Sequence, residues 1–384
     1  MNQFLIAAGA LTLAIWVYLL GARGGFWRLR AFDADQNQCA TPERWPGVVA
    51  VIPARNEART IATVIEAIVT QDYGGPLHVV VVDDHSEDGT GEIARLCATR
   101  SDRKVSVVSS PELATGWTGK LWALRQGVER AEMFEPKYFW FTDADIVHGP
   151  TTLGRLVASA EAKSLDLNSL MVLLRTNNFA EKLLIPAFVY FFLQLYPPRW
   201  IADPGARTAG AAGGCILLRR DALHRIGGLE AIRGEVIDDC ALARAVKQSG
   251  GTLWMGLTRA SRSLRVYAGF GEIRDMIART AFTQLRYSAM ILLGTLLGLM
   301  ATYILPALLL FSGNVESVVL GAVACILMAI TFVPMARFYR VAVIAGLALP
   351  FVAVFYAYAT WLSALRYWLG RGGQWKGRAQ AQKA

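Results

Sequence analysis

The sequence predicts an α/β domain built on a mostly parallel, doubly wound sheet, with apolar helices before and after it in the chain. Between about residues 45 and 268, short β-branched or aromatic runs alternate with helical stretches, which is the pattern of successive βα units. The runs are continuously apolar, which indicates strands buried on both faces. Hydrophobic residues make up 54% of the chain and charged residues 18%, which is more apolar than a typical soluble protein.

The chain begins with an apolar segment that is followed by arginines. Residues 4–20 are almost wholly apolar and carry no preceding charge, whereas Arg23, Arg28 and Arg30 come directly after them. The positive-inside rule then places the N-terminus outside and the next segment in the cytoplasm. A cleaved signal peptide is the alternative, but the basic start that such a peptide needs is missing. We expect a retained transmembrane anchor over residues 1–22.

The α/β region is expected to form a cytoplasmic catalytic domain over residues 46–288. Its expected strands are 48–52, 77–82, 105–108, 138–141 and 171–174, and expected helices between them include 58–69, 91–97 and 121–131. An apolar segment at about 183–195 is short for a membrane span and contains Pro186. It predicts either an interfacial helix near the bilayer or a buried core helix.

Three long apolar segments close the chain, at about 289–311, 315–335 and 341–365, and each is long enough to cross a bilayer. We therefore expect transmembrane helices within 289–365 and a basic tail over 366–384, in a multi-pass protein of the inner (cytoplasmic) membrane. Three crossings from a cytoplasmic domain put the tail outside, whereas its basic residues favour the inside. Pro306 and Pro350 mark places where one segment could turn back, so the side of the tail stays open.

Charge and cysteine content exclude several classes of function. The net charge of +9 lies largely near the apolar segments, which suits anionic lipid headgroups. No known nucleic-acid-binding module is present, so we expect no nucleic-acid partner. The five cysteines are isolated and lack C-x-x-C spacing, which indicates neither a zinc site nor a disulfide framework and suits a reducing compartment.

Two carboxylates one residue apart, Asp143 and Asp145, follow the apolar run 138–141. Open α/β sheets bind ligands at the carboxyl ends of their strands. Paired carboxylates there can hold a hard divalent cation and, through it, a diphosphate, and a cation relieves the repulsion between them. We therefore expect Mg²⁺ or Mn²⁺ at this pair. The alternative is a solvated turn that caps a helix starting near Thr151.

Polar residues also follow the first two expected strands. Pro53 has no N–H, so we expect the sheet ladder to end there, and Asn56 and Glu57 are typical of a helix start. Four valines run into the acidic loop that contains Asp84, whose carboxylate could accept hydrogen bonds from a base or a ribose. A polar turn without a ligand is the alternative for this loop.

Three further residues complete the candidate site. Lys120 lies where a glycine-containing loop enters a helix and could pair with a phosphate, although the spacing is not that of a P-loop. The Asp238-Asp239 pair opens a helical pattern and supplies either a helix cap or a general base. Arg286 precedes the membrane segments and is either a phosphate clamp or an ordinary juxtamembrane arginine.

The ordered set of these elements resembles the inverting family 2 glycosyltransferases with a GT-A (nucleotide-diphospho-sugar transferase) fold. The matching pieces are P-x-x-N-E at 53–57, V-D-D-x-S-x-D-G-T at 82–90, the D-x-D at 143–145 and the later acidic pair. Three motifs, G-W-T-G-K-x-W-A, F-T-Q-L-R-Y and G-G-Q-W-K-G-R, more specifically resemble the hopanoid-biosynthesis-associated membrane glycosyltransferases. The acidic pair departs from the usual Glu-Asp, and the usual Q-x-x-R-W is eroded around Gln284.

The resemblance implies a role for each matching position. Asp84 contacts the nucleotide base, Asp143 and Asp145 serve the sugar, ribose and metal, and Asp239 is the base. Pro53, Glu57, Lys120 and Arg286 join the nucleotide-sugar site. The implied reaction transfers one sugar, with inversion, from a nucleotide-diphosphate sugar to a lipid acceptor, such as a hopanoid or a related isoprenoid lipid. The alternatives are a processive polysaccharide synthase and a non-catalytic membrane scaffold with a nucleotide-binding domain.

Overall fold

The structure is a computed structural model in which residues 2–32, 42–370, 374–375 and 378–379 are described. It divides into two compact units, each built from separate stretches of the chain. The sheet unit comprises Arg30–Arg175, Trp200–Arg265 and Gln374–Ala384, and the helical unit comprises Met1–Leu29, Thr176–Arg199 and Val266–Gly373. Two parts of the range 46–288 that the sequence assigns to one catalytic domain thus group with the apolar helices.

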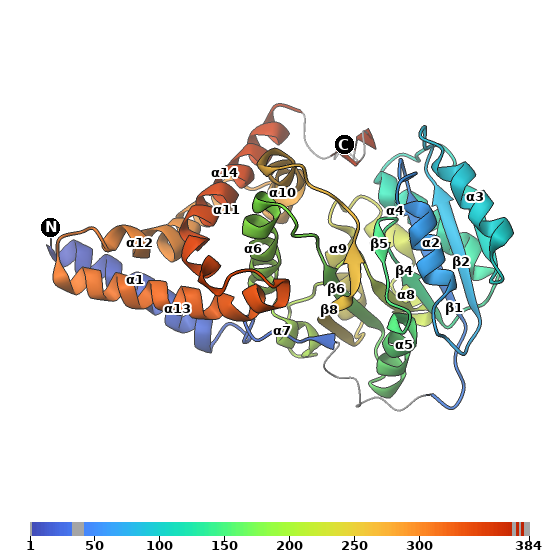
Figure 1. Ribbon diagram of the computed structural model, residues 1–384, viewed down its shortest axis with the longest axis horizontal. Helices are drawn as coiled ribbons and strands as arrows, with labels where there is room; N and C mark the ends of the chain where they lie inside the picture. Colours follow the sequence, from blue (N-terminus) through green and yellow to red (C-terminus); the bar gives the residue numbers. More distant parts are fainter. Residues whose placement is uncertain (1, 33–41, 371–373, 376–377, 380–384) are drawn as a thin grey trace. The chain divides into compact units, whose positions relative to one another are not determined.

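The sheet unit is built on an eight-stranded sheet of order β3-β2-β1-β4-β7-β6-β8-β5 (Figure 1). The strands are β1 (Val48–Ala54), β2 (Leu77–Asp83), β3 (Val105–Ser109), β4 (Tyr138–Phe141), β5 (Ile146–Val147), β6 (Leu167–Leu173), β7 (Ile216–Arg219) and β8 (Leu253–Ser263). Its helices are α2 (Ile61–Val69), α3 (Thr90–Arg100), α4 (Gly119–Glu132), α5 (Thr152–Ala162), α8 (Arg220–Arg225), η2 (Leu229–Ile232) and α9 (Asp238–Gln248).

Six of the eight strands share one direction. The strands β3, β2, β1 and β4 pair in parallel, as do β6 and β8, whereas β7 and β5 run antiparallel to their neighbours. The predicted α/β class with a mostly parallel sheet is confirmed, and the sheet is mixed. The strands β5, β7 and β8 were not predicted, because β5 has two residues, β7 has four and the outer part of β8 is polar.

The central strands are buried on both faces, as their continuous apolar sequence predicts. All seven residues of β1 are buried. Helix α2 packs on the sheet with Ile61, Val64, Ile65 and Ile68, which recur at one face of a helix. Burying each of these side chains contributes about 1.5–3 kcal/mol.

Gly127 lets α4 lie close against the sheet. A Cβ atom at this position would clash with Val51 of β1 and approach Val82 of β2 to 3.0 Å. Alanine here would push the helix outward and move the residues at its N-terminus, including Lys120. The glycine therefore connects the packing of the core with the position of a candidate site residue.

Two local expectations about the first strand are wrong. Strand β1 continues through Pro53 to Ala54, with Pro53 opposite Val82 of β2. Proline removes one donor, but its neighbours keep theirs, so the ladder does not stop there. Helix α2 begins at Ile61 after the N-cap Thr60, so Asn56 is not its cap.

The helical unit contains α1 (Asn2–Gly21), α6 (Phe179–Leu195), α10 (Phe270–Gln284), α11 (Ala289–Leu299), η3 (Met300–Ile304), α12 (Leu305–Leu309), α13 (Val315–Tyr339), η4 (Val343–Ala348) and α14 (Leu349–Trp368). The short α7 (Pro198–Ala202) and the antiparallel pair β9 (Gln374–Trp375) and β10 (Arg378–Ala379) complete the described elements. Most of the expected basic tail lies outside the described residues.

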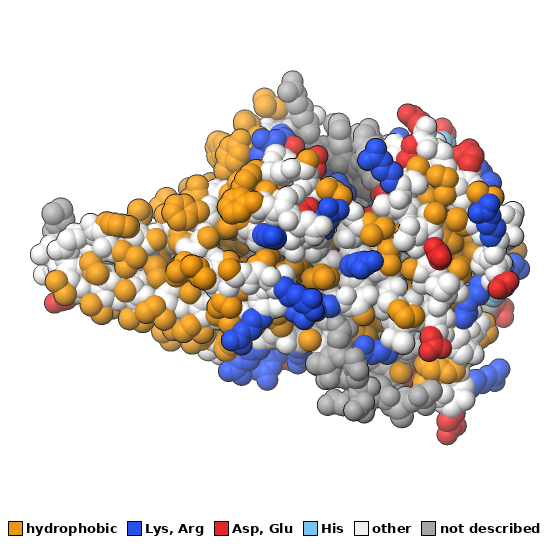
Figure 2. All heavy atoms as spheres, viewed as in Figure 1, with side chains coloured by type: hydrophobic (Ala, Val, Ile, Leu, Met, Phe, Trp, Pro, Cys, Tyr) orange, Lys and Arg blue, Asp and Glu red, His pale blue; other side chains and the backbone are white. Residues whose placement is uncertain are grey.

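Within the part of the chain that the structure describes, four helical segments are long and apolar enough to cross a membrane: Asn2–Gly21, Ala289–Leu309, Val315–Tyr339 and Val343–Trp368. Their exposed side chains are largely hydrophobic (Figure 2). Helix α6 starts with a capping box between Asn178 and Glu181 and continues through Pro186. It packs against α10, α13 and α14, which places it among the other helices of this unit.

Candidate active site

Two loops at the carboxyl edge of the sheet are joined by reciprocal hydrogen bonds. Ser86 Oγ accepts from Asn56 N at 3.0 Å, and Asn56 Oδ1 accepts from Glu87 N at 2.9 Å. The Thr90 hydroxyl accepts from Glu57 N at 2.8 Å, and the Asp88 carboxylate from Ala58 N at 3.0 Å. These four hydrogen bonds join the loop after β1 to the loop after β2. Asn56 and Glu57 contribute to the shape of this edge through those contacts.

Asp84 lies directly after β2 and is fully buried in this structure. Arg55 covers it: its Nη1 atom donates to the Asp84 carbonyl oxygen at 2.6 Å and lies 3.8 Å from the carboxylate. The guanidinium also donates to the His85 carbonyl oxygen at 3.3 Å. Both Asn56 and His85 have positive φ, at 52° and 53°, a strained conformation that is typical of functional loops. Sequence analysis missed Arg55, which is the basic neighbour of Asp84.

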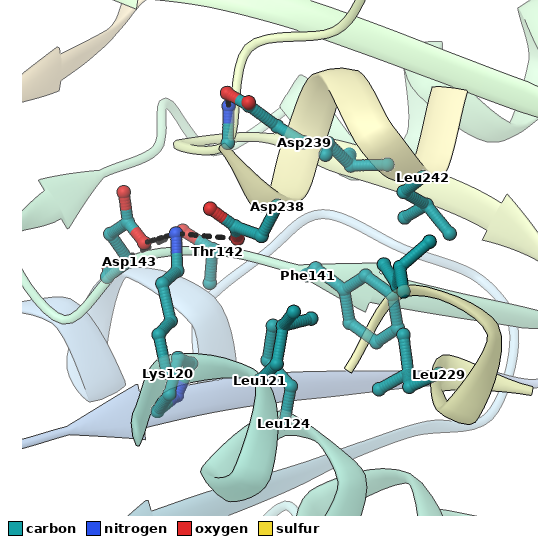
Figure 3. Close-up of a pocket in the computed structure, with 14 residues that line it drawn as sticks. Lys120, Leu121, Leu124, Phe141, Thr142, Asp143, Leu229, Asp238, Asp239 and Leu242 are labelled. Atoms are coloured by element: carbon teal, nitrogen blue, oxygen red, sulfur yellow. Dashed lines mark hydrogen bonds and ion pairs between the residues drawn. The ribbon is translucent and has the colours of Figure 1, made fainter. Parts of the chain in front are cut away.

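Lys120 joins the D-x-D to the later acidic pair. It is the second residue of α4, and its Nζ atom lies 2.9 Å from Asp143 Oδ1 and 3.1 Å from Asp238 Oδ2 (Figure 3). Burial alone would lower the pKa of Lys120, but the charges of Asp143 and Asp238 outweigh it and hold that pKa well above its usual value. Lys120 therefore stays charged, and these residues that are far apart in sequence lie together in space.

The carboxylate of Asp239 points toward the backbone of Gly213, and Lys120 Nζ lies near the same glycine. Its Oδ2 atom accepts from Gly213 N at 2.8 Å, and its Oδ1 atom accepts from Cys240 N at 2.7 Å. Burial and the neighbouring charge of Asp238 raise the pKa of Asp239 to about 6, against the opposing effects of Lys120 and the two N–H groups. A carboxylate whose pKa lies near neutrality is suited to accept a proton.

The D-x-D lies in the bend between β4 and β5. Ile146 N donates to the Asp143 carbonyl oxygen at 3.2 Å, and Leu264 N donates to that of Asp145 at 2.7 Å. Helix α5 has Thr151 as its N-cap residue without a side-chain cap, so the aspartates do not cap it. Both carboxylates are half-buried at the carboxyl end of β4.

The donor set fits a divalent cation that is shared with a substrate. Among the described residues, no group of three or more His, Cys, Asp or Glu side chains is placed to hold a metal ion. Mg²⁺ commonly binds through one or two carboxylates together with substrate phosphates, which requires no such group. The ammonium of Lys120 already neutralises Asp143, so a cation at that carboxylate would compete with Lys120.

A cavity extends from these charged groups into the core. One wall carries Lys120, Thr142, Asp143, Gly213, Asp238 and Asp239. The opposite wall is apolar and is formed by Pro53, Leu121, Leu124, Phe141, Ile216, Leu229, Ile232 and Leu242. In Figure 3, the apolar side chains of Leu121, Leu124 and Phe141 lie to the right of Lys120 and below Asp238. The structure thus brings together Pro53, Lys120, Asp143, Asp238 and Asp239.

Four of the predicted site residues, Glu57, Asp84, Asp145 and Arg286, are not part of this cavity lining. Asp84 and Glu57 belong to the joined loops after β2 and β1. Arg286 belongs to the helical unit, where it is exposed in the turn after α10 with φ of 52°. Sequence analysis missed Gly213, and the Gly213-Gly214 pair was its only visible sign.

Residues 49–227 match the family model described as Glycosyl transferase family 2. This part of the chain is thus similar to family 2 glycosyltransferase domains. The N-acetylglucosaminyltransferase of Mesorhizobium japonicum is 26% identical over 190 residues, which cover 47% of this chain and 41% of that protein. Glycosyltransferase AglE of Haloferax volcanii is 30% identical over 123 residues, which cover 32% of this chain and 38% of that protein. The matches thus span about two fifths of each relative.

Among solved structures, the mannosyltransferase PcManGT from Pyrobaculum calidifontis, in complex with GDP-Man and Mn²⁺, is similar in fold. The likeness covers 96% of this chain and 99% of that chain, with a TM-score of 0.59 and 18% sequence identity. Together with the family match, this likeness confirms the predicted GT-A-like fold.

Proposed function

We propose that this protein transfers a single sugar, with inversion, from a nucleotide-diphosphate sugar to a lipid acceptor at the membrane. The observation that carries the proposal is the cluster formed by Lys120, the D-x-D and the Asp238-Asp239 pair within a domain similar to family 2 glycosyltransferases. The complex of PcManGT contains a donor of this class and Mn²⁺. A membrane scaffold would have no need of this buried charged cluster.

The donor binds through groups that match its charge. The Asp84 carboxylate accepts a hydrogen bond from the base, with Arg55 closing the loop around it, while Pro53 and Glu57 shape the adjoining edge. The ammonium of Lys120 and the guanidinium of Arg286 are the proposed partners of phosphate oxygens. A Mg²⁺ or Mn²⁺ ion held by Asp145, with Asp143 beside it, would neutralise charge on the diphosphate.

Transfer follows from the position of Asp239. The acceptor hydroxyl oxygen attacks the anomeric carbon, the bond from that carbon to the diphosphate oxygen breaks, and its electron pair leaves with the diphosphate. Asp239 takes the hydroxyl proton, and Lys120 stabilises the charge that develops on the leaving group. Attack from the face opposite to the leaving group inverts the anomeric centre.

The lipid class of the acceptor rests on the apolar helices. A chain with four such helices in its described part holds its active domain at a membrane surface, where a lipid hydroxyl is available. The motifs around residues 116–123 and 282–287 resemble the hopanoid-associated enzymes, so a hopanoid or related isoprenoid lipid is the acceptor that we propose.

We further propose that α14 lies along the cytoplasmic face rather than crossing the membrane. Its C-terminal half packs on α10, where Arg366 pairs with Asp275 at 2.7 Å and the Ser363 hydroxyl accepts from Phe282 N at 3.0 Å. Helix α10 carries several charged residues, which suit the membrane surface rather than its core. Helix α13 ends just before α14 with the exposed basic residues Arg337 and Arg340.

The exposed side of α14 supports this arrangement. Its exposed apolar side chains recur at three- and four-residue intervals, and four of them are aromatic: Phe351, Val354, Tyr358, Trp361, Leu365 and Trp368. Such a stripe with tyrosine and tryptophan is typical of helices in the headgroup region. With α1, Ala289–Leu309 and α13 as the crossing segments, this proposed arrangement would leave the C-terminal tail in the cytoplasm, which its basic residues favour.

Purified full-length protein tests the proposed function directly. It is incubated with a panel of radiolabelled nucleotide-diphosphate sugars and membrane lipids, and lipid extracts are analysed by mass spectrometry. A lipid heavier by one sugar residue is expected with one donor. A water-soluble polymer would indicate a processive synthase, and failure to bind or cleave any donor would indicate a scaffold.

A further inference from the structure

A buried chain of hydroxyl groups and one imidazole runs beneath the D-x-D. His148 Nε2 lies 2.8 Å from Thr142 Oγ1, and His148 Nδ1 lies 2.9 Å from Ser261 Oγ. The Thr152 hydroxyl lies 3.4 Å from the same Ser261 oxygen. All four side chains are at least 97% buried, and the imidazole rests against the ring of Trp140 at 4.6 Å. The chain links β8, α5 and the segment after β4.

The Gly214 carbonyl oxygen lies at the end of this series of hydrogen bonds. Thr142 Oγ1 lies 3.1 Å from this oxygen, which can only accept, and 3.4 Å from the Asp143 carbonyl oxygen. When the single Thr142 proton is donated to Gly214, Thr142 accepts from His148. In that arrangement the Nε2 atom of His148 carries the proton, Nδ1 is unprotonated, and Ser261 donates to it.

The same series of hydrogen bonds reaches both the D-x-D and the glycine segment that binds Asp239. Thr142 is the residue before Asp143, the first member of the D-x-D. Gly214 adjoins Gly213, whose N–H binds Asp239. Ser169 Oγ donates to the Ala212 carbonyl oxygen at 3.2 Å and so orients the peptide that carries the Gly213 N–H. Thr142 and Ser169 therefore hold the glycine segment at two points.

We infer that His148 is a positioning residue that, through the N–H of its Nε2 atom, fixes Thr142 and thereby both the D-x-D and the segment that orients Asp239. This inference rests on the proposed function and adds a residue that touches no substrate. Burial lowers the pKa of His148 to about 3, so the imidazole stays neutral and retains one acceptor nitrogen for Ser261.

Two amide substitutions separate the two nitrogens of His148. Glutamine places an N–H near the position of Nε2 and can still donate to Thr142, whereas asparagine reaches only the position of Nδ1 and contacts Ser261. We expect H148Q to keep kcat within about threefold of wild type. We expect H148N to lose up to ~10²-fold in kcat, because small displacements of reacting groups carry losses of that order. Both variants carry a buried amide, so melting temperature and donor affinity measure any general loss of structure.

A second matched pair tests the next link. T142S keeps the hydroxyl and T142V replaces it by a methyl group of similar shape, so T142V should resemble H148N and T142S should resemble wild type. Equal kcat values for H148Q and H148N, at equal melting temperatures, would overturn the inference. So would a T142V variant as active as T142S.

The tautomer of His148 is measured independently of turnover. The chain has four histidines, so ¹⁵N-histidine labelling in detergent gives few signals, and the signal that H148Q lacks identifies His148. The nitrogen shifts should show a neutral ring protonated on Nε2. A ring protonated on Nδ1 would refute the inference even if the protein transferred sugar. Absence of transfer by wild type would instead refute the proposed function, and the tautomer would still decide the direction of the chain.

Discussion

Replacing Asp239 by asparagine preserves the size of the side chain and removes its capacity to take a proton. If Asp239 is the general base, turnover should fall by ~10²–10⁴-fold. Binding of the nucleotide-sugar should change little, because Asp143 and Lys120 remain in place. The variant D238N is the matched control, because it makes the same change at the adjacent residue.

The structural cost of D239N can be worked out from its hydrogen bonds. Both carboxylate oxygens accept backbone N–H groups, from Gly213 at 2.8 Å and from Cys240 at 2.7 Å. An amide has one acceptor oxygen, so one of these N–H groups loses its partner, at ~1–3 kcal/mol. Folded proteins have about 5–15 kcal/mol of stability. If the lowest stability in this range is combined with the largest hydrogen-bond loss, a free energy of unfolding of ~2 kcal/mol remains and almost all molecules stay folded. A loss of ~10²-fold in turnover therefore cannot come from unfolding.

The assay compares turnover at saturating donor, donor affinity by calorimetry and melting temperature for wild type, D239N and D238N. In D238N, Lys120 loses a partner at 3.1 Å but keeps Asp143 at 2.9 Å, so a smaller loss of turnover is expected than in D239N. Turnover of D239N within threefold of wild type would refute the assignment. Loss of donor binding in parallel with turnover would show that Asp239 supports the site and does not act as the base.

Four further predictions follow from the same structure. Chelation and dialysis of the purified enzyme should abolish sugar transfer, and addition of Mg²⁺ or Mn²⁺ should restore it. The variant D145N should lose most activity at an unchanged melting temperature. Activity that survives chelation would exclude a metal requirement. Asp239 acts only when ionised and its pKa is raised to about 6, so turnover should fall about tenfold for each pH unit below 6. Because Lys120 lowers the pKa of Asp239, K120M should shift this acid side of the pH–turnover profile to higher pH. An unshifted profile would assign the acid side to a group other than Asp239. G127A should destabilise the protein and lower turnover by displacing α4, as seen in melting temperature and kcat, whereas A123G on the same helix should affect stability alone. Single cysteines are placed at Ser312, Glu87 and Gly370 in a variant without native cysteines. In intact cells, the cysteine at Ser312 should react with a membrane-impermeant thiol reagent, whereas those at Glu87 and Gly370 should not. Labelling at Gly370 would show that α14 crosses the membrane.

The strands were predictable from the sequence where a run of residues is continuously apolar. The valine runs of β1 and β2 have one stable environment, the middle of a sheet covered on both faces, and the structure places them there. By contrast, β7 is four residues long and β5 only two, and their pairing depends on partners far away in the chain. Local pattern holds no information about such pairings, so these strands were missed.

The candidate site was predictable by residue type but not by contact. Carboxylates after an apolar strand indicated Asp143 and Asp145, and paired carboxylates at the start of a helical pattern indicated Asp239. That Lys120 lies between Asp143 and Asp238 depends on how α4 and α9 meet over the sheet, which no local motif encodes. His148 was missed because a lone histidine after a strand has no distinctive pattern, and its importance lies entirely in contacts with Thr142 and Ser261.

The most direct test of the central claim is a transfer assay with wild type and D239N in parallel. Purified protein, a radiolabelled nucleotide-diphosphate sugar, Mg²⁺ or Mn²⁺ and a membrane lipid extract are combined, and label in the organic phase is measured over time. Wild type should form a lipid that carries one sugar with the inverted anomeric configuration, and D239N should bind the donor but form product at least ~10²-fold more slowly. Label that stays in the aqueous phase with every donor, or a product of retained configuration, would contradict these expectations.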